Sequence, residues 1–250
     1  MGQTSSRSLD AMLDRGASPS HARTGVHALG TIFLKIILQY LIMGVVLLTS
    51  AGTFFWSRAW VYVGLGVLCF ALNALVVSHN NPQMIVERHR KRGDTKAADK
   101  ILTSSITIAT IAMWIAAGID AVRFGRFVLS PVALATGTAF HLAGMAIIGW
   151  AMVTNPFLEK SVRIQSDRGQ EVVSTGPYGI VRHPMYFAMI LIGIACPLIL
   201  GSAWACVPLA LYILLFILRT HFEDKTLRRE LHGYQAYTLV TCYRLVPLVW

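Results

Sequence analysis

The chain has 250 residues, of which 55% are apolar and 14% are charged. A soluble globular domain carries about 25% charged residues, so this composition excludes a surface that faces water on all sides. The net charge of +10 lies in short segments between long apolar runs. That distribution is typical of loops beside anionic lipid head groups and argues against a nucleic-acid-binding surface.

The N-terminal half is predicted to be a tail followed by membrane helices. Residues 1–27 are rich in Ser, Arg and Gly, which predicts a flexible cytoplasmic tail. A spanning helix needs about 20 mostly apolar residues. Within the region 28–154, the stretches that meet this requirement predict four spanning helices at 30–51, 59–79, 101–121 and 132–154.

The apolar stretch 186–218 is too long for one straight span, and Leu200-Gly201-Ser202 is a turn signal near its middle. It predicts a membrane hairpin of two helices, followed by a helical tail. This topology places both termini on the same side of the membrane. Nearly all Lys and Arg residues then lie on that side, which the positive-inside rule identifies as cytoplasmic. The basic residues predicted on the opposite side are Arg58, Arg123 and Arg126.

A polar segment, 155–185, separates the last predicted span from the hairpin. Its residues 162–173 have a Gly-containing turn at 166–169, and we predict a small cytoplasmic β-hairpin there. The complete prediction is an all-α integral membrane protein with four spanning helices, a membrane hairpin, this β-hairpin loop and a helical tail. The region 155–250 is expected to hold the functional site, because a structured loop beside membrane helices favours one.

Two motifs in this region carry the chemistry. In the first, 175–186, Pro184 suits the first position of a helix, so Arg182 and His183 lie at its N-terminus, where an anion is attracted. In the second, Arg219 and Glu223 share a helix face, although such a pair is often an ordinary ion pair. Acids at the lipid boundary are costly unless they are solvated or partnered, and they suit the amine and hydroxyls of a nucleoside amino acid.

These motifs resemble the isoprenylcysteine carboxyl methyltransferase and phospholipid methyltransferase superfamily. The matching residues are Gly176, Tyr178, Arg182, His183, Pro184, Tyr186, Glu223, Asp224, Gly233, Tyr234 and Tyr237. The resemblance implies S-adenosylmethionine as the cofactor and Arg219 as the residue that orients the substrate. The implied cofactor-binding residues are Gln170, Glu171, Val172, Val173, Tyr178, Arg182, His183, Pro184, Met185, Tyr186, Glu223 and Asp224.

The sequence departs from the family pattern at three places. The acidic pair is Glu-Asp rather than Glu-Glu, Ala188 replaces a frequent Gly, and Gln170 stands where related sequences often carry His. These departures affect the fine geometry of the cofactor site. The expected partners are anionic lipids and a hydrophobic substrate that enters from the bilayer. Its acceptor group is left open among a prenylcysteine carboxylate, a phospholipid amine, a small thiol and an unrelated hydrophobic molecule.

Two other functional classes share features with this sequence. Membrane sterol reductases also use an Arg-His-Pro-x-Tyr segment with NADPH, but typically have Asn where Met185 stands. A transporter or scaffold would place polar residues near the middle of several spans. Here Asn73 and His141 are the main candidates, and both are expected to be satisfied hydrogen bonders, whereas Asp120 is expected to mark the end of a span. The four cysteines show no metal-binding spacing, so no metal is expected.

Overall fold

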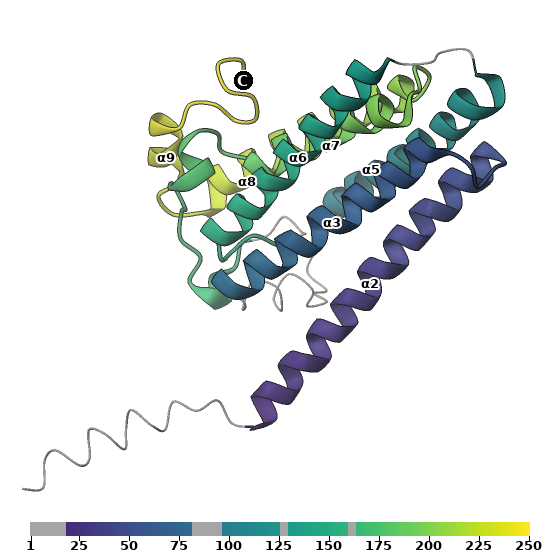
Figure 1. Cartoon of the computed structure of the whole chain (residues 1–250). Coiled ribbons are helices and arrows are strands. Elements are labelled where there is room, and N and C mark those ends of the chain that lie inside the picture. The colour runs from purple at the N-terminus through teal and green to yellow at the C-terminus, as the bar shows by residue number, and fades with distance from the viewer. Residues whose placement is uncertain (1–18, 82–96, 126–129, 160–163) are drawn as a thin grey trace, which may run out of the picture. The chain divides into compact units, whose positions relative to one another are not determined.

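The computed structural model describes residues 19–81, 97–125, 130–159 and 164–250. The chain divides into two units, Met1–Leu38 and Gln39–Trp250, and the site lies in the second. Every regular element in the described ranges is helical (Figure 1). The elements are α2 (Pro19–Ala51), α3 (Ser57–Asn80), α5 (Ala97–Gly118), η1 (Ile119–Phe124), α6 (Pro131–Thr154), η2 (Ser166–Arg168), η3 (Gly176–Gly179), α7 (Pro184–Leu200), α8 (Cys206–Glu230) and α9 (Tyr234–Val240).

Four helical segments in the described ranges are long and apolar enough to cross a membrane: Ser57–Asn80, Asp99–Phe124, Pro131–Thr154 and Cys206–Glu230. Three of them coincide with the spans predicted at 59–79, 101–121 and 132–154. The stretch predicted at 30–51 lies within the longer helix α2, which begins at Pro19, inside the predicted flexible tail; that part of the tail prediction is wrong. Residues 1–18 of the predicted tail lie outside the described ranges. Large apolar side chains stay exposed along these helices, as on α3 at Leu68, Leu72 and Leu75. Such surfaces need lipid around them, as in an integral membrane protein.

Helices α6 and α7 pack closely against each other because glycines on α6 leave no side chain between them. A Cβ atom at Gly144 would lie 2.7 Å from a side-chain atom of Ile192, and one at Gly137 would lie 2.8 Å from Leu198. Small residues let helix backbones approach closely in membranes, where the hydrophobic effect does not drive helices together. These two contacts also show that α6 and α7 run antiparallel, because the earlier glycine meets the later residue.

The turn between α7 and α8 begins where the sequence predicts it. Gly201 adopts a left-handed conformation (φ 81°), and its N–H donates to the carbonyl of Pro197, as in a common helix C-cap. The next residue, Ser202, donates from its hydroxyl to the Asp120 carboxylate over 2.7 Å. Asp120 also accepts the N–H of Trp204 at 3.1 Å. The buried Asp120 therefore ties the end of the third predicted span to this turn. The placement of the α7–α8 pair in the membrane remains a prediction.

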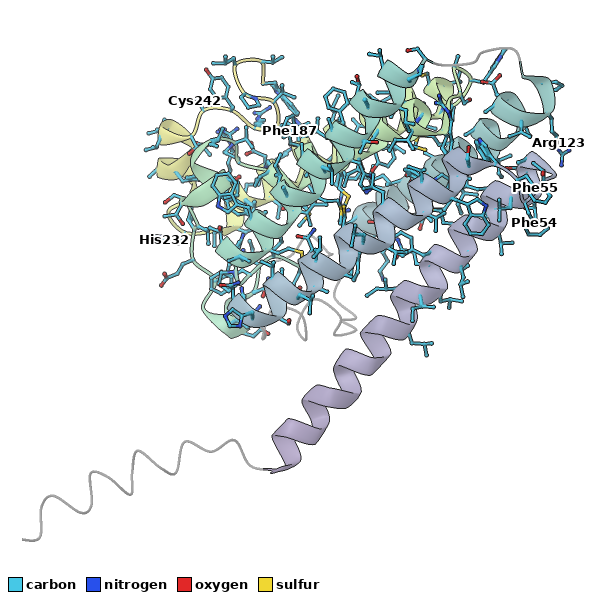
Figure 2. All side chains as sticks on the ribbon, viewed as in Figure 1. Phe54, Phe55, Arg123, Phe187, His232 and Cys242 are labelled. Atoms are coloured by element: carbon cyan, nitrogen blue, oxygen red, sulfur yellow. The ribbon has the colours of Figure 1, made fainter. Side chains whose placement is uncertain are left out.

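The two ends of the helix bundle differ in the residues they carry. Figure 2 shows Phe54, Phe55 and Arg123 at one end and His232 and Cys242 at the other. Phe54 is 74% exposed and Phe55 is 98% exposed. The end with His232 is the one predicted to be cytoplasmic, and this orientation remains a prediction.

The predicted β-hairpin at 162–173 is wrong for the residues that the structure describes there, 164–173, which contain no strand. Residues 165–170 instead form a local turn that is held by hydrogen bonds to Gln165. Its carbonyl accepts the N–H groups of Arg168 and Gln170, and its own N–H donates to the Gln170 side-chain oxygen at 2.7 Å. These local bonds take backbone groups that a strand ladder would need. Residues 162 and 163 lie outside the described ranges.

The two polar residues inside predicted spans have different outcomes. The amide of Asn73 donates to the carbonyls of Cys69 and Met145, each at 3.1 Å, so its predicted role as an intrahelical and interhelical hydrogen bonder is confirmed. For His141 the same prediction is wrong. Among the described residues, neither of its ring nitrogens has a hydrogen-bond partner, although the residue is only 5% exposed.

Candidate active site

The Arg-His-Pro segment enters α7 with its backbone already bonded to the C-terminal segment. Pro184 occupies the first turn of α7, as predicted. The N–H groups of Arg182 and His183 donate to the carbonyls of Tyr243 and Arg244, each over 2.9 Å. These two amides are used within the fold and are not presented to an anion. Their bonds fix the position of the His183 side chain. The predicted anion site at the N-terminus of α7 stays a prediction.

Asp224 is the centre of a buried ionic cluster. Its carboxylate accepts from Arg182 at 2.8 Å, Arg228 at 2.9 Å and the hydroxyl of Tyr234 at 3.2 Å. The Arg244 guanidinium lies 3.2 Å away. The Asp224 side chain is 3% exposed and that of Arg182 is 2% exposed. This carboxylate is surrounded by protein donors, and its role in the geometry is to join α8 to the segment before α7 and to the C-terminal tail.

The C-terminal residues complete this cluster. The Arg182 guanidinium donates to the carbonyls of Thr241 and Cys242 at 2.9 and 3.0 Å. The Tyr237 hydroxyl on α9 donates to the Tyr178 carbonyl at 2.6 Å. Burial raises the pKa of Tyr237 to about 12, so this hydroxyl stays protonated at neutral pH and keeps its role as donor. Segments far apart in the sequence thus hold Tyr178 and Arg182 in place.

Glu223 shares His183 with its neighbour Asp224, whose Oδ1 atom lies 3.6 Å from His183 Nε2, but its other partner is different. The Tyr186 hydroxyl donates to the Glu223 carboxylate. The nearer ring nitrogen of His183, Nδ1, lies 3.9 Å from Glu223 Oε1. The rings of His183 and Tyr186 are nearly parallel, with their planes 3° apart and their centroids 5.8 Å apart. The Glu223 side chain is 23% exposed, which leaves part of the carboxylate accessible to a ligand.

Arg219 is held by a residue that the sequence analysis did not single out. Its Nη2 atom lies 3.0 Å from the Oδ1 atom of Asp99 on α5. Its guanidinium also lies over the Tyr186 ring, with Cζ 5.2 Å from the ring centroid, a distance at which cation–π attraction operates. Arg219 is 8% exposed. The guanidinium is therefore fixed between α5 and α7, beside the group formed by His183, Tyr186 and Glu223.

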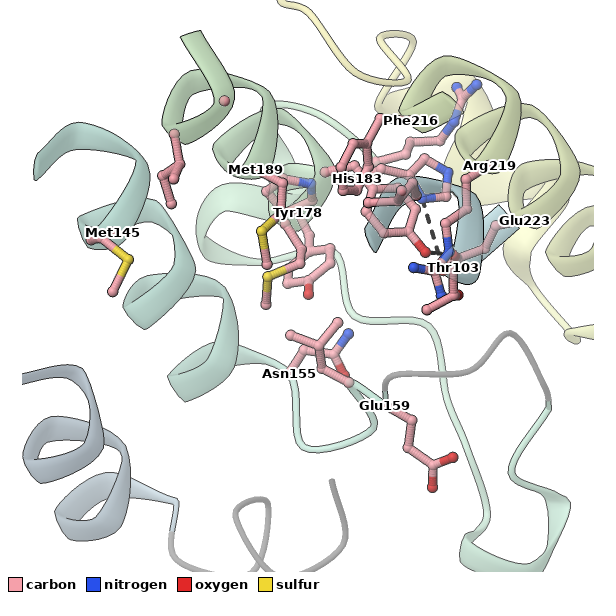
Figure 3. A pocket seen from close by; sticks show the side chains of 18 of the residues that line it. Thr103, Met145, Asn155, Glu159, Tyr178, His183, Met189, Phe216, Arg219 and Glu223 are labelled. Carbon is pink, nitrogen blue, oxygen red and sulfur yellow. Dashed lines mark hydrogen bonds and ion pairs between the residues drawn. The ribbon is translucent and has the colours of Figure 1, made fainter. Parts of the chain in front are cut away.

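One cavity of about 520 Å³ adjoins all but one of the predicted site residues. This volume lies within the range of about 300–1,000 Å³ that is usual for small-molecule sites. The predicted residues that line it are Gln170, Glu171, Val172, Val173, Tyr178, Arg182, His183, Pro184, Met185, Tyr186, Arg219 and Glu223. Asp224 is not among them, in agreement with its internal cluster. Figure 3 shows Arg219, Glu223, His183 and Tyr178 around this cavity, with Met145 and Met189 farther along it.

Sequence reasoning missed several residues that line the same cavity. Asn155, Phe157 and Glu159 follow α6, and Thr103 belongs to α5. The loop after α6 was recognised only as a whole, and no local pattern distinguishes these side chains from those of an ordinary connector. Asp99 was missed because its contact with Arg219 joins positions far apart in the chain. An acid in the first turn of an otherwise apolar helix was the available signal.

The segment that carries these side chains also has a match among protein families. Residues 137–229 match the model of the isoprenylcysteine carboxyl methyltransferase family. The matched segment runs from within α6 nearly to the end of α8 and contains the Arg-His-Pro segment and the acidic pair. No curated protein matched the chain. The family match and the apolar helices together indicate a methyltransferase of a membrane.

Proposed function

We propose that the chain transfers a methyl group from S-adenosylmethionine to a lipophilic acceptor bound in this cavity. The observation that carries the proposal is the continuity of the cavity. His183 and Glu223 lie at its polar end, and the same cavity continues between helices to Met113 and Met145. A polar cofactor and an apolar acceptor would meet where these two parts join.

The side chains at the polar end fit the chemical groups of the cofactor. The partly exposed Glu223 carboxylate suits an amine or ribose hydroxyls. The aromatic faces of Tyr178 and Tyr186 suit the purine ring or the sulfonium, for which cation–π attraction is worth about 0.5–2 kcal/mol. Because Glu223 accepts the hydroxyl of Tyr186, the orientation of that ring is fixed before any ligand binds. Gln170 and Glu171 line the cavity from the loop side.

S-adenosylmethionine, when bound, supplies both the methyl group and its leaving group, so the protein need not provide a nucleophile. The work left to the chain is to align the acceptor and to exclude water. We assign the alignment to Arg219. A guanidinium has five N–H donors, so Arg219 can bind an anionic group of the acceptor while it keeps the contact with Asp99. Its position over Tyr186 places it beside the proposed cofactor site.

The acceptor is proposed to enter from the bilayer. The part of the cavity away from Glu223 is lined by Met43 and Tyr62 from the first two helices of the described bundle and by Met113 and Trp114 from α5. Apolar and aromatic walls of this kind suit a lipid chain, whereas a fully water-soluble acceptor would gain little from them. A carboxylate, an amine and a thiol remain the candidate acceptor groups.

The proposal is tested by radiolabel transfer in purified protein reconstituted in lipid nanodiscs. Methyl-labelled S-adenosylmethionine is added with membrane lipid extract, and the labelled product is identified by mass spectrometry. Glu223→Gln should weaken cofactor binding at least about tenfold, because a charge-assisted hydrogen bond contributes about 1.5–3 kcal/mol. The matched control is Glu230→Gln, since Glu230 is an exposed acid on the same helix. Equal cofactor affinities in the two variants would contradict the assignment.

The same preparation separates this proposal from the two other classes. Saturable binding of NADPH without binding of S-adenosylmethionine would favour a reductase. Binding of neither cofactor, with uptake of a solute into liposomes, would favour a transporter.

A further inference from the structure

His141 is a buried polar side chain that the proposed reaction does not use. It lies on α6, is 5% exposed and lines the same cavity as Glu223. The His141 ring packs edge-to-face against the Tyr62 ring, with the ring centroids 5.9 Å apart and the ring planes at 76°. Within the part of the chain that the structure describes, neither ring nitrogen of His141 has a hydrogen-bond partner.

The position of His141 along the cavity follows from the packing of α6 on α7. His141 lies midway between Gly137, which faces Leu198, and Gly144, which faces Ile192. Because the helices are antiparallel, His141 is level with about residue 194 of α7. Tyr186 lies eight residues before that level, which corresponds to about 12 Å at 1.5 Å per residue. His141 therefore marks the cavity about 12 Å from the proposed reaction centre.

The surroundings of His141 make an unpaired imidazole unfavourable. The cavity at this level is lined by Tyr62, Met145 and Gly193, which are apolar or aromatic. A neutral imidazole carries one N–H donor and one acceptor nitrogen, and buried polar groups in proteins are nearly always hydrogen-bonded. A plain hydrocarbon chain in the cavity would leave both ring nitrogens unpaired. A ligand with an oxygen at this depth would satisfy at least one of them.

We propose that His141 recognises a hydroxyl or carbonyl oxygen on the apolar part of the acceptor, about 12 Å from its reacting end. This inference rests on the proposed function, because it names the substrate class of the same cavity. The acceptor is then an oxygenated lipid or isoprenoid-like molecule and not an unsubstituted hydrocarbon chain. His141 acts as a specificity residue, since it is too far from the reaction centre to take part in the transfer.

Two matched probes test the inference directly. Decanoate and ω-hydroxydecanoate differ only by a hydroxyl at the end remote from the carboxylate, and the extended chain has about the required length. Their affinities for the protein in nanodiscs are measured by calorimetry. The wild type should bind ω-hydroxydecanoate about 2- to 10-fold more tightly than decanoate, the range that corresponds to one net hydrogen bond. Equal affinities for the two probes, or binding of neither, would overturn the inference.

Variants of His141 show whether this residue is responsible. His141→Leu should lose the preference for the hydroxylated probe, whereas His141→Gln should keep it, because the amide offers both a donor and an acceptor. His221→Leu makes the same change at an exposed position of α8 outside the cavity lining and should also keep the preference. A preference that persists in His141→Leu would assign the recognition to another group, or to an ordered water, and overturn the proposal.

A second readout does not depend on whether His141→Leu folds. In protein labelled with nitrogen-15 histidine, ω-hydroxydecanoate should shift the ring resonance that is missing in His141→Gln, and decanoate should not. Binding of S-adenosylmethionine is measured in parallel. If the wild type does not bind the cofactor, the proposed function fails, and the probe comparison still decides whether His141 recognises an oxygen.

Discussion

Removal of the Asp224 carboxylate should destabilise the protein more than removal of either of its half-buried partners, Arg228 and Arg244. Asp224 and Arg182 are 3% and 2% exposed as side chains, so their ion pair is shielded from water. Truncation of one member of a buried pair leaves an uncompensated charge and costs about 3–5 kcal/mol. Asp224→Ala should approach this loss, because it leaves the buried Arg182 guanidinium without its carboxylate partner. Arg182→Ala should cost less, because the Asp224 carboxylate then keeps Arg228 and Arg244.

These two half-buried partners provide the internal comparison. The side chains of Arg228 and Arg244 are 39% and 28% exposed, so water screens their attraction to Asp224. Exposed ion pairs contribute about 0–1 kcal/mol. Arg228→Ala and Arg244→Ala should therefore lower the free energy of unfolding by at most about 1 kcal/mol each.

Thermal unfolding in nanodiscs measures this order. For a chain of this size, 1 kcal/mol corresponds to about 2–4 °C in Tm, so Asp224→Ala should lower Tm by about 6–20 °C. Arg228→Ala should lower it by no more than about 4 °C. If Asp224→Ala is no more destabilising than Arg228→Ala, the stability of the cluster does not depend on its buried carboxylate.

Three further predictions concern other contacts. Asp99→Asn removes the charge that fixes Arg219, so kcat/KM for the methyl acceptor should fall about tenfold, or 1.4 kcal/mol. The affinity for S-adenosylmethionine should stay the same. A loss of cofactor affinity instead would refute the positioning role. Gly144→Val inserts a side chain against Ile192 and should lower the free energy of unfolding by about 1–3 kcal/mol. A Tm for Gly144→Val equal to that of the wild type would contradict this expectation. Because the pKa of Tyr237 is raised in the fold to about 12, its contribution to stability is complete below pH 10 and is lost as the pH rises toward 12. Spectrophotometric titration of wild type and Tyr237→Phe should therefore show no difference in tyrosinate below about pH 11.

Much of the fold follows from local sequence properties. A run of about 20 apolar residues can hide its backbone polar groups from lipid only as a helix or within a barrel. The spans at 59–79, 101–121 and 132–154 could therefore be predicted from composition. The start of α7 at Pro184 and the turn at Gly201 could also be predicted, because each rests on the backbone preference of a single residue.

Contacts between distant segments decide which groups face the cavity. The N–H groups of Arg182 and His183 lie at the predicted N-terminus of α7, but the C-terminal segment binds them. Glu223 and Asp224 were both predicted to bind the cofactor; of the two, Glu223 lines the cavity and Asp224 does not. Adjacent residues on a helix point about 100° apart, so one can face a cavity while the other faces the interior. Which of the two faces the cavity depends on where Arg182 and Arg244 lie in space.

The β-hairpin and His141 show two other limits. The hairpin prediction relied on a Gly-containing turn, but side-chain bonds between Gln165 and Gln170 satisfy the backbone locally. The state of His141 could not be predicted, because a histidine within an apolar run has the same sequence signature whether or not a neighbouring helix offers it a partner.

We propose that the cavity between His183, Tyr186 and Glu223 binds S-adenosylmethionine. An experimental structure of the protein in lipid, prepared with S-adenosylmethionine, would show whether it does. We expect density for the nucleoside in contact with those three side chains. Density for the cofactor at another place, or an unchanged cavity at a saturating concentration, would rule this site out.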